Sequence, residues 1–252
     1  MSRPAARVVV APDKEALAVA VAARLLTTLA DAIAERGRAH VSLTGGSIGV
    51  AALAAVADSP ARSTVDWSRV HLWWSDERFL PAGDPDRNAT QAREALLDAL
   101  PLDPATVHEP PASDGVDGDD PGAAAARYAA ELAAQGEGAE TPEFDVLLLG
   151  MGPDGHVASL FPGHEGLARD ESSVVAIRDS PKPPPTRLSF TFGALHRARR
   201  VWLVAAGGEK APAVARGVGG DDPSSTPAAG VHGSLETLWL LDAAAAADLD
   251  EA

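Results

Sequence analysis

Short apolar runs alternate with longer, alanine-rich segments along most of the chain. Runs that are rich in leucine or β-branched residues and apolar at successive positions are typical of strands buried on both faces. We therefore predict strands over residues 7–11, 40–44, 69–74, 144–150, 173–177, 200–206 and 237–242. The segments between them include four with the length and apolar spacing of helices, over residues 13–36, 47–57, 88–100 and 123–135.

This alternation predicts the fold class. Strands that are apolar on both faces and separated by helices form a parallel sheet covered on both sides, which is a doubly wound α/β layer structure. The acidic, turn-rich segments 113–122 and 217–227 are predicted to be surface loops, because the alternation of helix and strand resumes after each. A single domain over residues 1–252 is the expected organisation.

Unusual polar residues follow four of the predicted strands. Open parallel sheets bind ligands beyond the carboxyl ends of their strands, so these segments are the places to look for chemistry. They read TGGS over 44–47, SDER over 75–78, GMGPDGH over 150–156 and GGEK over 207–210.

The first segment combines a tight turn with a helix start. Gly45 and Gly46 allow the backbone to turn sharply and expose its N–H groups, and Ser47 is predicted at the N-cap of the following helix. A helix N-terminus of this kind suits a phosphate group. An ordinary strand-to-helix turn explains the same residues, and the segment is not a Walker A loop because no Gly-Lys-Ser/Thr follows.

The second segment places three successive ionisable residues after the pair Trp73-Trp74. A solvated turn would explain them, but the tryptophans indicate that this strand end lies against the core, where charges are costly unless paired. We therefore predict site residues here, and Asn88 further on is a candidate helix cap. The three ionisable residues are Asp76, Glu77 and Arg78.

The third segment holds an aspartate and a histidine within a glycine-rich loop. Its glycines, at positions 150, 152 and 155, allow the loop to fold tightly over a ligand, and Asp154 and His156 then present a carboxylate and an imidazole. This pair suits base catalysis, in which the imidazole takes a proton from water and the carboxylate orients the ring. His164 is close enough in sequence to line the same site, although most histidines are structural or exposed.

Two further basic residues are candidate partners for a phosphate or carboxylate group. Arg187 follows a run of prolines that could hold its guanidinium rigidly, and Lys210 opens a predicted helix after a strand. An edge-strand arginine and a solvated lysine are the plain alternatives. The chain has a net charge of −15 and only three lysines, so a phosphate ligand would need a local positive pocket.

Composition narrows the classes of partner. The negative charge disfavours nucleic acid and anionic lipid. The absence of cysteine excludes disulfides and thiolate zinc sites, and we expect neither a metal nor an organic cofactor. No signal-peptide pattern opens the chain and no uncharged stretch is long enough to span a bilayer, so we expect a soluble, cytoplasmic protein, a monomer with a small-molecule substrate.

Taken together, TGGS, SDERFLP, LLLGMGPDGHVASLFPG, PPPTRLSFT and GGEKA resemble the glucosamine-6-phosphate isomerase/6-phosphogluconolactonase family, from about Val8 to Asp242. The resemblance implies a three-layer, Rossmann-like α/β/α fold with a mostly parallel sheet. The implied activity is hydrolysis of 6-phosphoglucono-1,5-lactone to 6-phosphogluconate, in the oxidative pentose phosphate pathway.

The resemblance also implies roles for the candidate residues. His156 would be the general base that activates water, Asp154 would support it, and Arg78 would line the active site. The phosphate would lie on the Gly45-Gly46-Ser47 turn with Arg187 and Lys210 as charge partners, and Asp76 and Glu77 are included among the substrate-binding residues. One departure is Ile48-Gly49, where the family commonly has Thr-Pro.

Three alternatives remain open from the sequence. A sugar-phosphate deaminase or isomerase is disfavoured because Phe161 stands where related deaminases have glutamate and Arg78 where they have tyrosine. A non-catalytic sensor of sugar phosphates is disfavoured by the intact His156 and Asp154. A dinucleotide-binding oxidoreductase would use the Gly-x-Gly-x-x-Gly pattern at 150–155, but Pro162 and Gly163 interrupt the helix that such a site needs.

Overall fold

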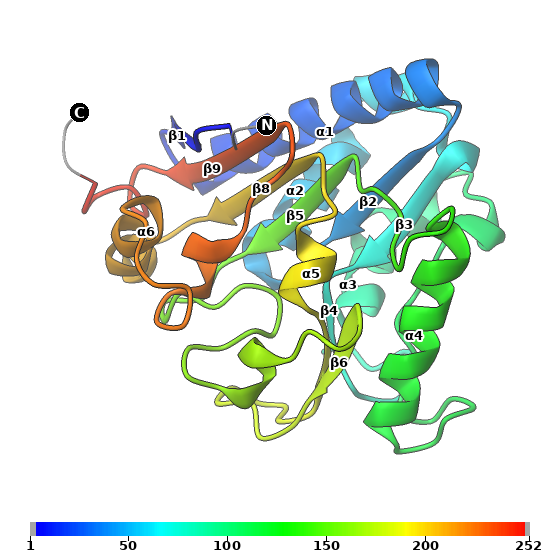
Figure 1. The fold of residues 1–252 in the computed structure, drawn as a ribbon. Coiled ribbons are helices and arrows are strands. Elements are labelled where there is room, and N and C mark those ends of the chain that lie inside the picture. Colours follow the sequence, from blue (N-terminus) through cyan, green and yellow to red (C-terminus); the bar gives the residue numbers. More distant parts are fainter. Residues whose placement is uncertain (1–3, 250–252) are drawn as a thin grey trace.

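The structure is a computed structural model that describes residues 4–249. A six-stranded, fully parallel sheet runs through its centre in the order β1-β9-β8-β5-β2-β3 (Figure 1). Its strands are β1 (Arg7–Ala11), β2 (Ala39–Leu43), β3 (Val70–Trp74), β5 (Val146–Gly150), β8 (Arg200–Ala205) and β9 (Glu236–Asp242). The predicted parallel sheet is thus confirmed.

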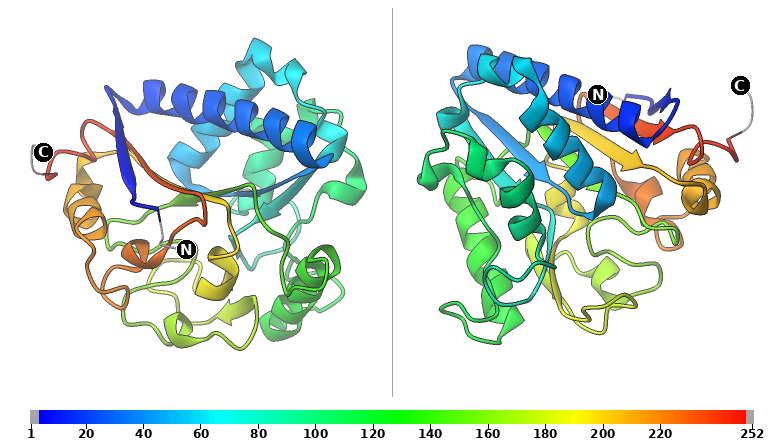
Figure 2. Two further views of the ribbon diagram at one scale, coloured as in Figure 1. Left: turned by 45° about the horizontal axis from the view of Figure 1, so that its top comes forward. Right: turned by 180° about the vertical axis from the view of Figure 1, so that it is seen from behind.

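Helices cover both faces of this sheet, as the views of Figure 2 show. One apolar core joins the sheet to α1 (Lys14–Arg36), α2 (Gly46–Asp58) and α3 (Asn88–Ala95). A second core on the opposite face joins it to α4 (Pro121–Gln135), α5 (Phe192–Leu195) and α6 (Ala211–Val218). The neighbouring side chains Trp73 and Trp74 are both fully buried, one in each core. The fold is therefore the expected three-layer α/β/α arrangement.

A small antiparallel sheet lies beside the main one. Its order is β4-β7-β6, with β4 (Asp76–Arg78), β7 (Arg187–Phe190) and β6 (Val174–Ile177). The sequence predicted β6 but assigned it no separate sheet, and it predicted neither β4 nor β7 as a strand. The charged β4 begins only two residues after β3 ends, so it resembles a turn until β7 pairs with it.

The largest difference between a predicted and an observed helix boundary is at the end of α3. The helix predicted over 88–100 ends at Ala95, because Leu96 leaves the helical backbone region with φ −151° and ψ −51°. Short 3₁₀ turns complete the described chain: η1 (Pro60–Thr64), η2 (Trp67–Arg69), η3 (Leu97–Ala99), η4 (Pro104–Thr106), η5 (Glu165–Ala168), η6 (Gly208–Lys210) and η7 (Pro227–Gly230).

Helix α1 is long and apolar enough, by length and composition, to cross a membrane. The sequence prediction concerned uncharged stretches, and α1 carries Arg24 within its apolar run. Asp13 caps its start by accepting from the Ala16 N–H at 2.8 Å, and Gly37 ends it with φ +79°. Eight of its side chains are buried in the first core, so its apolar face is used in packing.

The strand order creates a switch point between β2 and β5. From β2 the chain passes through α2 to β3 on one side, whereas from β5 it goes to β8 on the other side. The two connections therefore leave neighbouring strands in opposite directions and open a crevice at their carboxyl ends. The segments TGGS and GMGPDGH, which follow β2 and β5, meet at this crevice.

Candidate active site

A cavity of about 290 Å³ occupies the crevice. It is built by the loops after β2 and β5, by β4, by the connection from β6 to β7, and by η6. Eight of the ten residues predicted from the sequence line it: Gly45, Gly46, Ser47, Asp76, Arg78, His156, Arg187 and Lys210. Further lining residues include Thr44, Asn88, Gly150, Gly152, Lys182 and Pro183.

The residue at the N-cap of α2, in the turn after β2, differs from the prediction. Helix α2 begins at Gly46 with Gly45 at the N-cap, so the prediction of Ser47 as N-cap is wrong. Gly46 has φ +79°, in the left-handed region that favours glycine, so the turn into the helix depends on a glycine at this position. Gly45 has no side chain to accept from the first-turn N–H groups, so these donors remain for a ligand in the cavity.

The loops after β2 and β5 are tied together directly. The Gly150 N–H donates to the Thr44 hydroxyl at 3.0 Å. Gly45 also lies close to Asn88: a Cβ at position 45 would come within 1.9 Å of the Asn88 amide oxygen. The cavity wall therefore depends on glycine here for close approach of two elements.

His156 and Asp154 are in contact. The two atoms His156 Nδ1 and Asp154 Oδ1 are 2.6 Å apart, and the imidazole is 16% exposed. Burial raises the pKa of Asp154, but the hydrogen bond and charge of His156, together with Lys182, outweigh it and hold this pKa well below its usual range. The carboxylate therefore stays ionised and fixes the orientation of the ring, although it does not itself line the cavity.

Gly152 and Phe161 shape the surroundings of the imidazole. A Cβ at Gly152 would lie 2.2 Å from the His156 ring, so only glycine leaves room for it. The Phe161 ring packs 4.5 Å from the imidazole, centroid to centroid. His164 takes no part: its Nε2 lies 2.8 Å from the Arg178 carbonyl oxygen and its Nδ1 accepts from Gly166.

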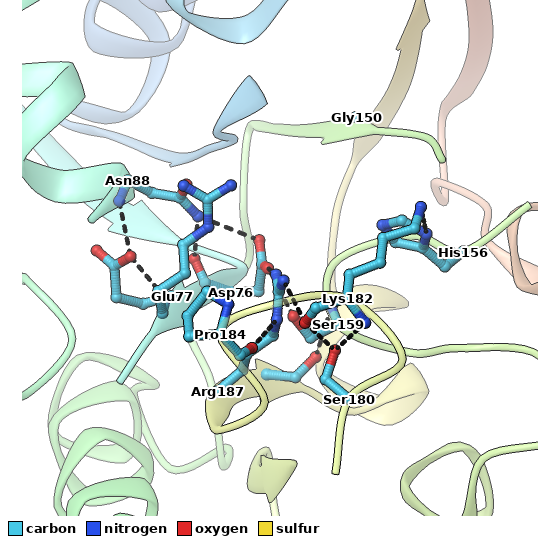
Figure 3. Close-up of polar contacts among 12 residues, drawn as sticks. Asp76, Glu77, Asn88, Gly150, His156, Ser159, Ser180, Lys182, Pro184 and Arg187 are labelled. Atoms are coloured by element: carbon cyan, nitrogen blue, oxygen red, sulfur yellow. Dashed lines mark hydrogen bonds and ion pairs between the residues drawn. The ribbon is translucent and has the colours of Figure 1, made fainter. Parts of the chain in front are cut away.

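Lys182 lines the cavity and is a candidate site residue that the sequence analysis missed. Its Nζ lies 3.3 Å from both Asp154 Oδ1 and His156 Nδ1. Figure 3 shows the Lys182 side chain extending toward His156. The available signal was that Lys182 is one of only three lysines and stands inside the proline run before Arg187. Nothing local in the sequence connects it to a histidine 26 positions earlier.

Asp76 and Glu77 point in opposite directions, because successive side chains of a strand alternate. Asp76 lines the cavity, and its Oδ2 accepts from the Ser159 hydroxyl at 2.7 Å. Asn88 donates from Nδ2 to the Asp76 carbonyl oxygen at 2.9 Å (Figure 3). Asn88 is thus a wall residue and the first residue of α3, with Arg87 at the N-cap position, and its predicted capping role is wrong.

Glu77 is fully buried and does not line the cavity. Its carboxylate accepts from the backbone N–H groups of Arg78, Asn88 and Ala89 at 2.7, 2.7 and 2.8 Å. Burial raises the pKa of Glu77 to about 7, against the opposing effects of Arg87 and these N–H groups. Glu77 therefore holds the start of α3 against β4, and a direct contact with a ligand in this cavity is not available to it.

Four cationic side chains face the cavity: Arg78, Lys182, Arg187 and Lys210. Burial lowers the pKa of Lys210, and Lys182 and Lys14 lower it further, whereas Glu209 and Asp242 oppose the change. The Arg187 side chain is 7% exposed and lies with Nη1 3.9 Å from Asp76 Oδ2. Within residues 4–249, no group of three or more His, Asp or Glu side chains is arranged to hold a metal ion.

This geometry can be compared with known proteins. The sequence profile of the glucosamine-6-phosphate isomerases/6-phosphogluconolactonase family matches residues 12–239. A protein of Streptomyces coelicolor named 6-phosphogluconolactonase is 57% identical over 246 residues, which are 96% of this chain and 94% of that protein. A protein of the same name from Mycobacterium tuberculosis is 48% identical over 239 residues, or 94% of this chain and 96% of its own.

Solved structures lead to the same family. The structure of 6-phosphogluconolactonase from Trypanosoma brucei superposes with a TM-score of 0.82 at 27% identity, covering 98% of this chain and all of that one (100%). The family profile matches residues 12–239, and this range includes the whole cavity, whose lining residues run from Thr44 to Lys210. The chain belongs to the glucosamine-6-phosphate isomerase/6-phosphogluconolactonase family.

Proposed function

We propose that the chain hydrolyses 6-phosphoglucono-1,5-lactone to 6-phosphogluconate. The observation that carries the proposal is the His156–Asp154 pair, held at 2.6 Å at the wall of a cationic cavity. The relatives named 6-phosphogluconolactonase, at 48–57% identity over nearly the whole chain, support the same reaction.

The reaction follows from the state of the imidazole. With Nδ1 directed to the Asp154 carboxylate, Nε2 is the nitrogen free to take a proton from a water molecule. The water oxygen attacks the lactone carbonyl carbon, and the carbonyl oxygen becomes an oxyanion. The ring C–O bond then breaks, and the imidazolium returns its proton to the departing oxygen, so that His156 ends as it began.

The cationic side chains that line the cavity can stabilise the negative charge that develops on the carbonyl oxygen. Lys182 lines the cavity beside His156, and its ammonium group is assigned to the developing oxyanion, although its 3.3 Å contact is with Nδ1, on the side of the ring that Asp154 holds. Arg78 lines the same cavity from β4. Because the negative charge develops only during reaction, a cation fixed in a half-buried site stabilises the transition state more than the substrate.

The phosphate end of the substrate is assigned to the start of α2. Gly46 and Ser47 present first-turn N–H groups that lack a capping side chain, and Lys210 lines the cavity beside them. The positive end of the helix dipole adds to the attraction. This division separates binding of the phosphate from reaction at the carbonyl group.

The deciding experiment is base consumption in a pH-stat with freshly prepared 6-phosphoglucono-1,5-lactone, after subtraction of spontaneous opening. We expect a rate above background that falls by about 10²- to 10⁴-fold in His156→Ala, the range for a lost general base. His196→Ala is the matched control, because His196 bonds the Gly230 carbonyl away from the cavity. No excess rate in the parent protein, or full activity in His156→Ala, contradicts the proposal.

A further inference from the structure

Arg187 is directed mainly at the backbone of the loop that precedes it. Its Nε donates to the Pro184 carbonyl oxygen at 3.2 Å, and its Nη2 donates to the Pro183 and Lys182 carbonyl oxygens at 3.0 and 3.2 Å. Figure 3 shows the guanidinium curled against this loop. Three contacts of one side chain therefore hold three consecutive carbonyl groups.

The loop needs these donors because of its composition. It connects β6 to β7 and carries prolines at 181, 183, 184 and 185, none of which has an N–H to offer. Its other internal bonds come from Ser180, whose N–H donates to Pro185 O at 2.9 Å and whose hydroxyl donates to Lys182 O at 3.0 Å. The rigid, planar guanidinium donates to the Pro183 and Pro184 carbonyls and is a second donor to the Lys182 carbonyl.

One of the loop residues held by Arg187 is Lys182, whose side chain reaches His156. The Lys182 carbonyl is bonded by Arg187, and the Lys182 ammonium lies 3.3 Å from Asp154 Oδ1 and His156 Nδ1. A shift of the loop backbone would carry the ammonium with it. Arg187 and His156 are thus connected through Lys182.

Little of Arg187 remains for a phosphate group. Only Nη1 is not directed at the loop, and it lies 3.9 Å from the Asp76 carboxylate. An anion that approached Nη1 would also approach Asp76, whose negative charge would repel it. The first-turn N–H groups of α2 have no side-chain cap, so an anion can approach them without such a penalty.

We propose that Arg187 is a positioning residue, which fixes the 182–184 backbone and thereby sets the Lys182 ammonium against His156 and Asp154, and that it is not a ligand of the substrate phosphate. The expected effect on kcat rests on the proposed lactone hydrolysis, whereas the expected position of the Lys182 ammonium does not.

The kinetic test is a double-mutant cycle with Lys182→Met, Arg187→Met and the double variant. We expect each single variant to lower kcat by about 10²-fold with KM changed less than threefold, the order of loss when a group at a reacting centre moves by about 1 Å. The double variant should be no slower than Lys182→Met alone, because Arg187 acts only through Lys182. Losses that multiply, or a raised KM in Arg187→Met, would overturn the proposal.

The conservative variant Arg187→Lys separates geometry from charge. A lysine keeps the positive charge but cannot bond three carbonyls with one planar fork, so we expect it to be as slow as Arg187→Met. Inhibition by inorganic phosphate gives a second measure: its inhibition constant should stay within twofold in Arg187→Met. Activity retained by Arg187→Lys, with phosphate inhibition lost in Arg187→Met, would mark Arg187 as a phosphate ligand and refute positioning.

A spectroscopic measurement does not depend on turnover. The ¹⁵N chemical shifts of the His156 ring should move in Lys182→Met and move in the same way in Arg187→Met, because both displace the ammonium near Nδ1. If the parent protein shows no lactone hydrolysis but these shifts still coincide, the proposed function fails and the positioning role stands. His156 shifts unchanged in Arg187→Met would contradict the positioning role even if lactone is hydrolysed.

Thermal unfolding of each variant checks that the variant is folded. Arg62→Met is the matched control, since Arg62 also donates to a backbone carbonyl, that of Ala57 at 2.7 Å, but lies outside the cavity. We expect it to leave kcat and the His156 shifts unchanged. Should Arg187→Met not fold, Arg187→Lys carries the same comparison with Lys182→Met.

Discussion

Replacing Asp154 with asparagine measures how much the carboxylate contributes to the base. When His156 takes a proton, the imidazolium and the carboxylate become an ion pair. Two unit charges about 4 Å apart attract by about 4 kcal/mol at an effective dielectric constant of about 20. The atoms in contact are 2.6 Å apart, but each charge is spread over its whole group, so we take about 4 Å as the separation of the two charges.

Two features of the site reduce that figure. The Asp154 side chain is 34% exposed, and Lys182 lies 3.3 Å from the same carboxylate oxygen. Solvent and the ammonium group both screen the pair, and we take about 3 kcal/mol as the remainder. Since about 1.4 kcal/mol corresponds to a factor of ten in rate, Asp154→Asn should lower kcat by about 10²-fold.

The assay is base consumption with the lactone, with kcat and KM determined separately. The asparagine oxygen can still accept from His156 Nδ1, so the ring keeps its orientation and KM should change less than twofold. Asp117→Asn is the control, because Asp117 is paired with Arg127 on the surface and should show the parental rate. A loss in kcat below threefold, or a loss expressed only in KM, would refute this account of Asp154.

Three other predictions follow from single contacts. Lys210→Met should raise KM by about tenfold or more with little change in kcat, because a phosphate contact far from the carbonyl is made equally in ground and transition states; steady-state kinetics checks this. Gly45→Ala should lower kcat by about tenfold, since its Cβ would come within 1.9 Å of the Asn88 amide oxygen and displace a cavity wall, and a parental rate would show that Asn88 can move freely. Burial and neighbouring charges lower the pKa of His40 to about 3 and that of His71 to about 4. As pH falls from about 6.5 to about 4, these histidines therefore bind protons in the unfolded chain but stay neutral in the folded chain. Stability contributed by the neutral rings is thus present above about pH 6.5 and lost below it; urea unfolding across this range should show a weaker fall for His71→Gln than for the parent, and parallel curves would contradict it.

Much of the fold could be predicted from the sequence alone. The runs that became β5 and β8 are apolar at successive positions, and only a sheet covered on both faces buries such a run. The same pattern locates the site, because the loops at the carboxyl ends of parallel strands meet at one edge. Gly45 and Gly46, and the Asp154–His156 pair, were found in this way.

The small antiparallel sheet and the orientation of its side chains could not be predicted. β4 is three charged residues that form a strand only because β7 pairs with them. The pairing sends Asp76 into the cavity and Glu77 to the start of α3, two roles that the sequence letters do not distinguish. Register and face are properties of the pair of strands and not of either strand.

Sequence by itself determined what depends on neighbours along the chain: which runs are buried, where the backbone turns, and which residues stand at strand ends. Tertiary structure alone decided what depends on residues far apart, such as Lys182 meeting His156 and Arg187 bonding the loop that carries it. The physical reason is that burial and turn geometry are local preferences, whereas the distance between two side chains on different elements is fixed only when both elements pack against the same sheet.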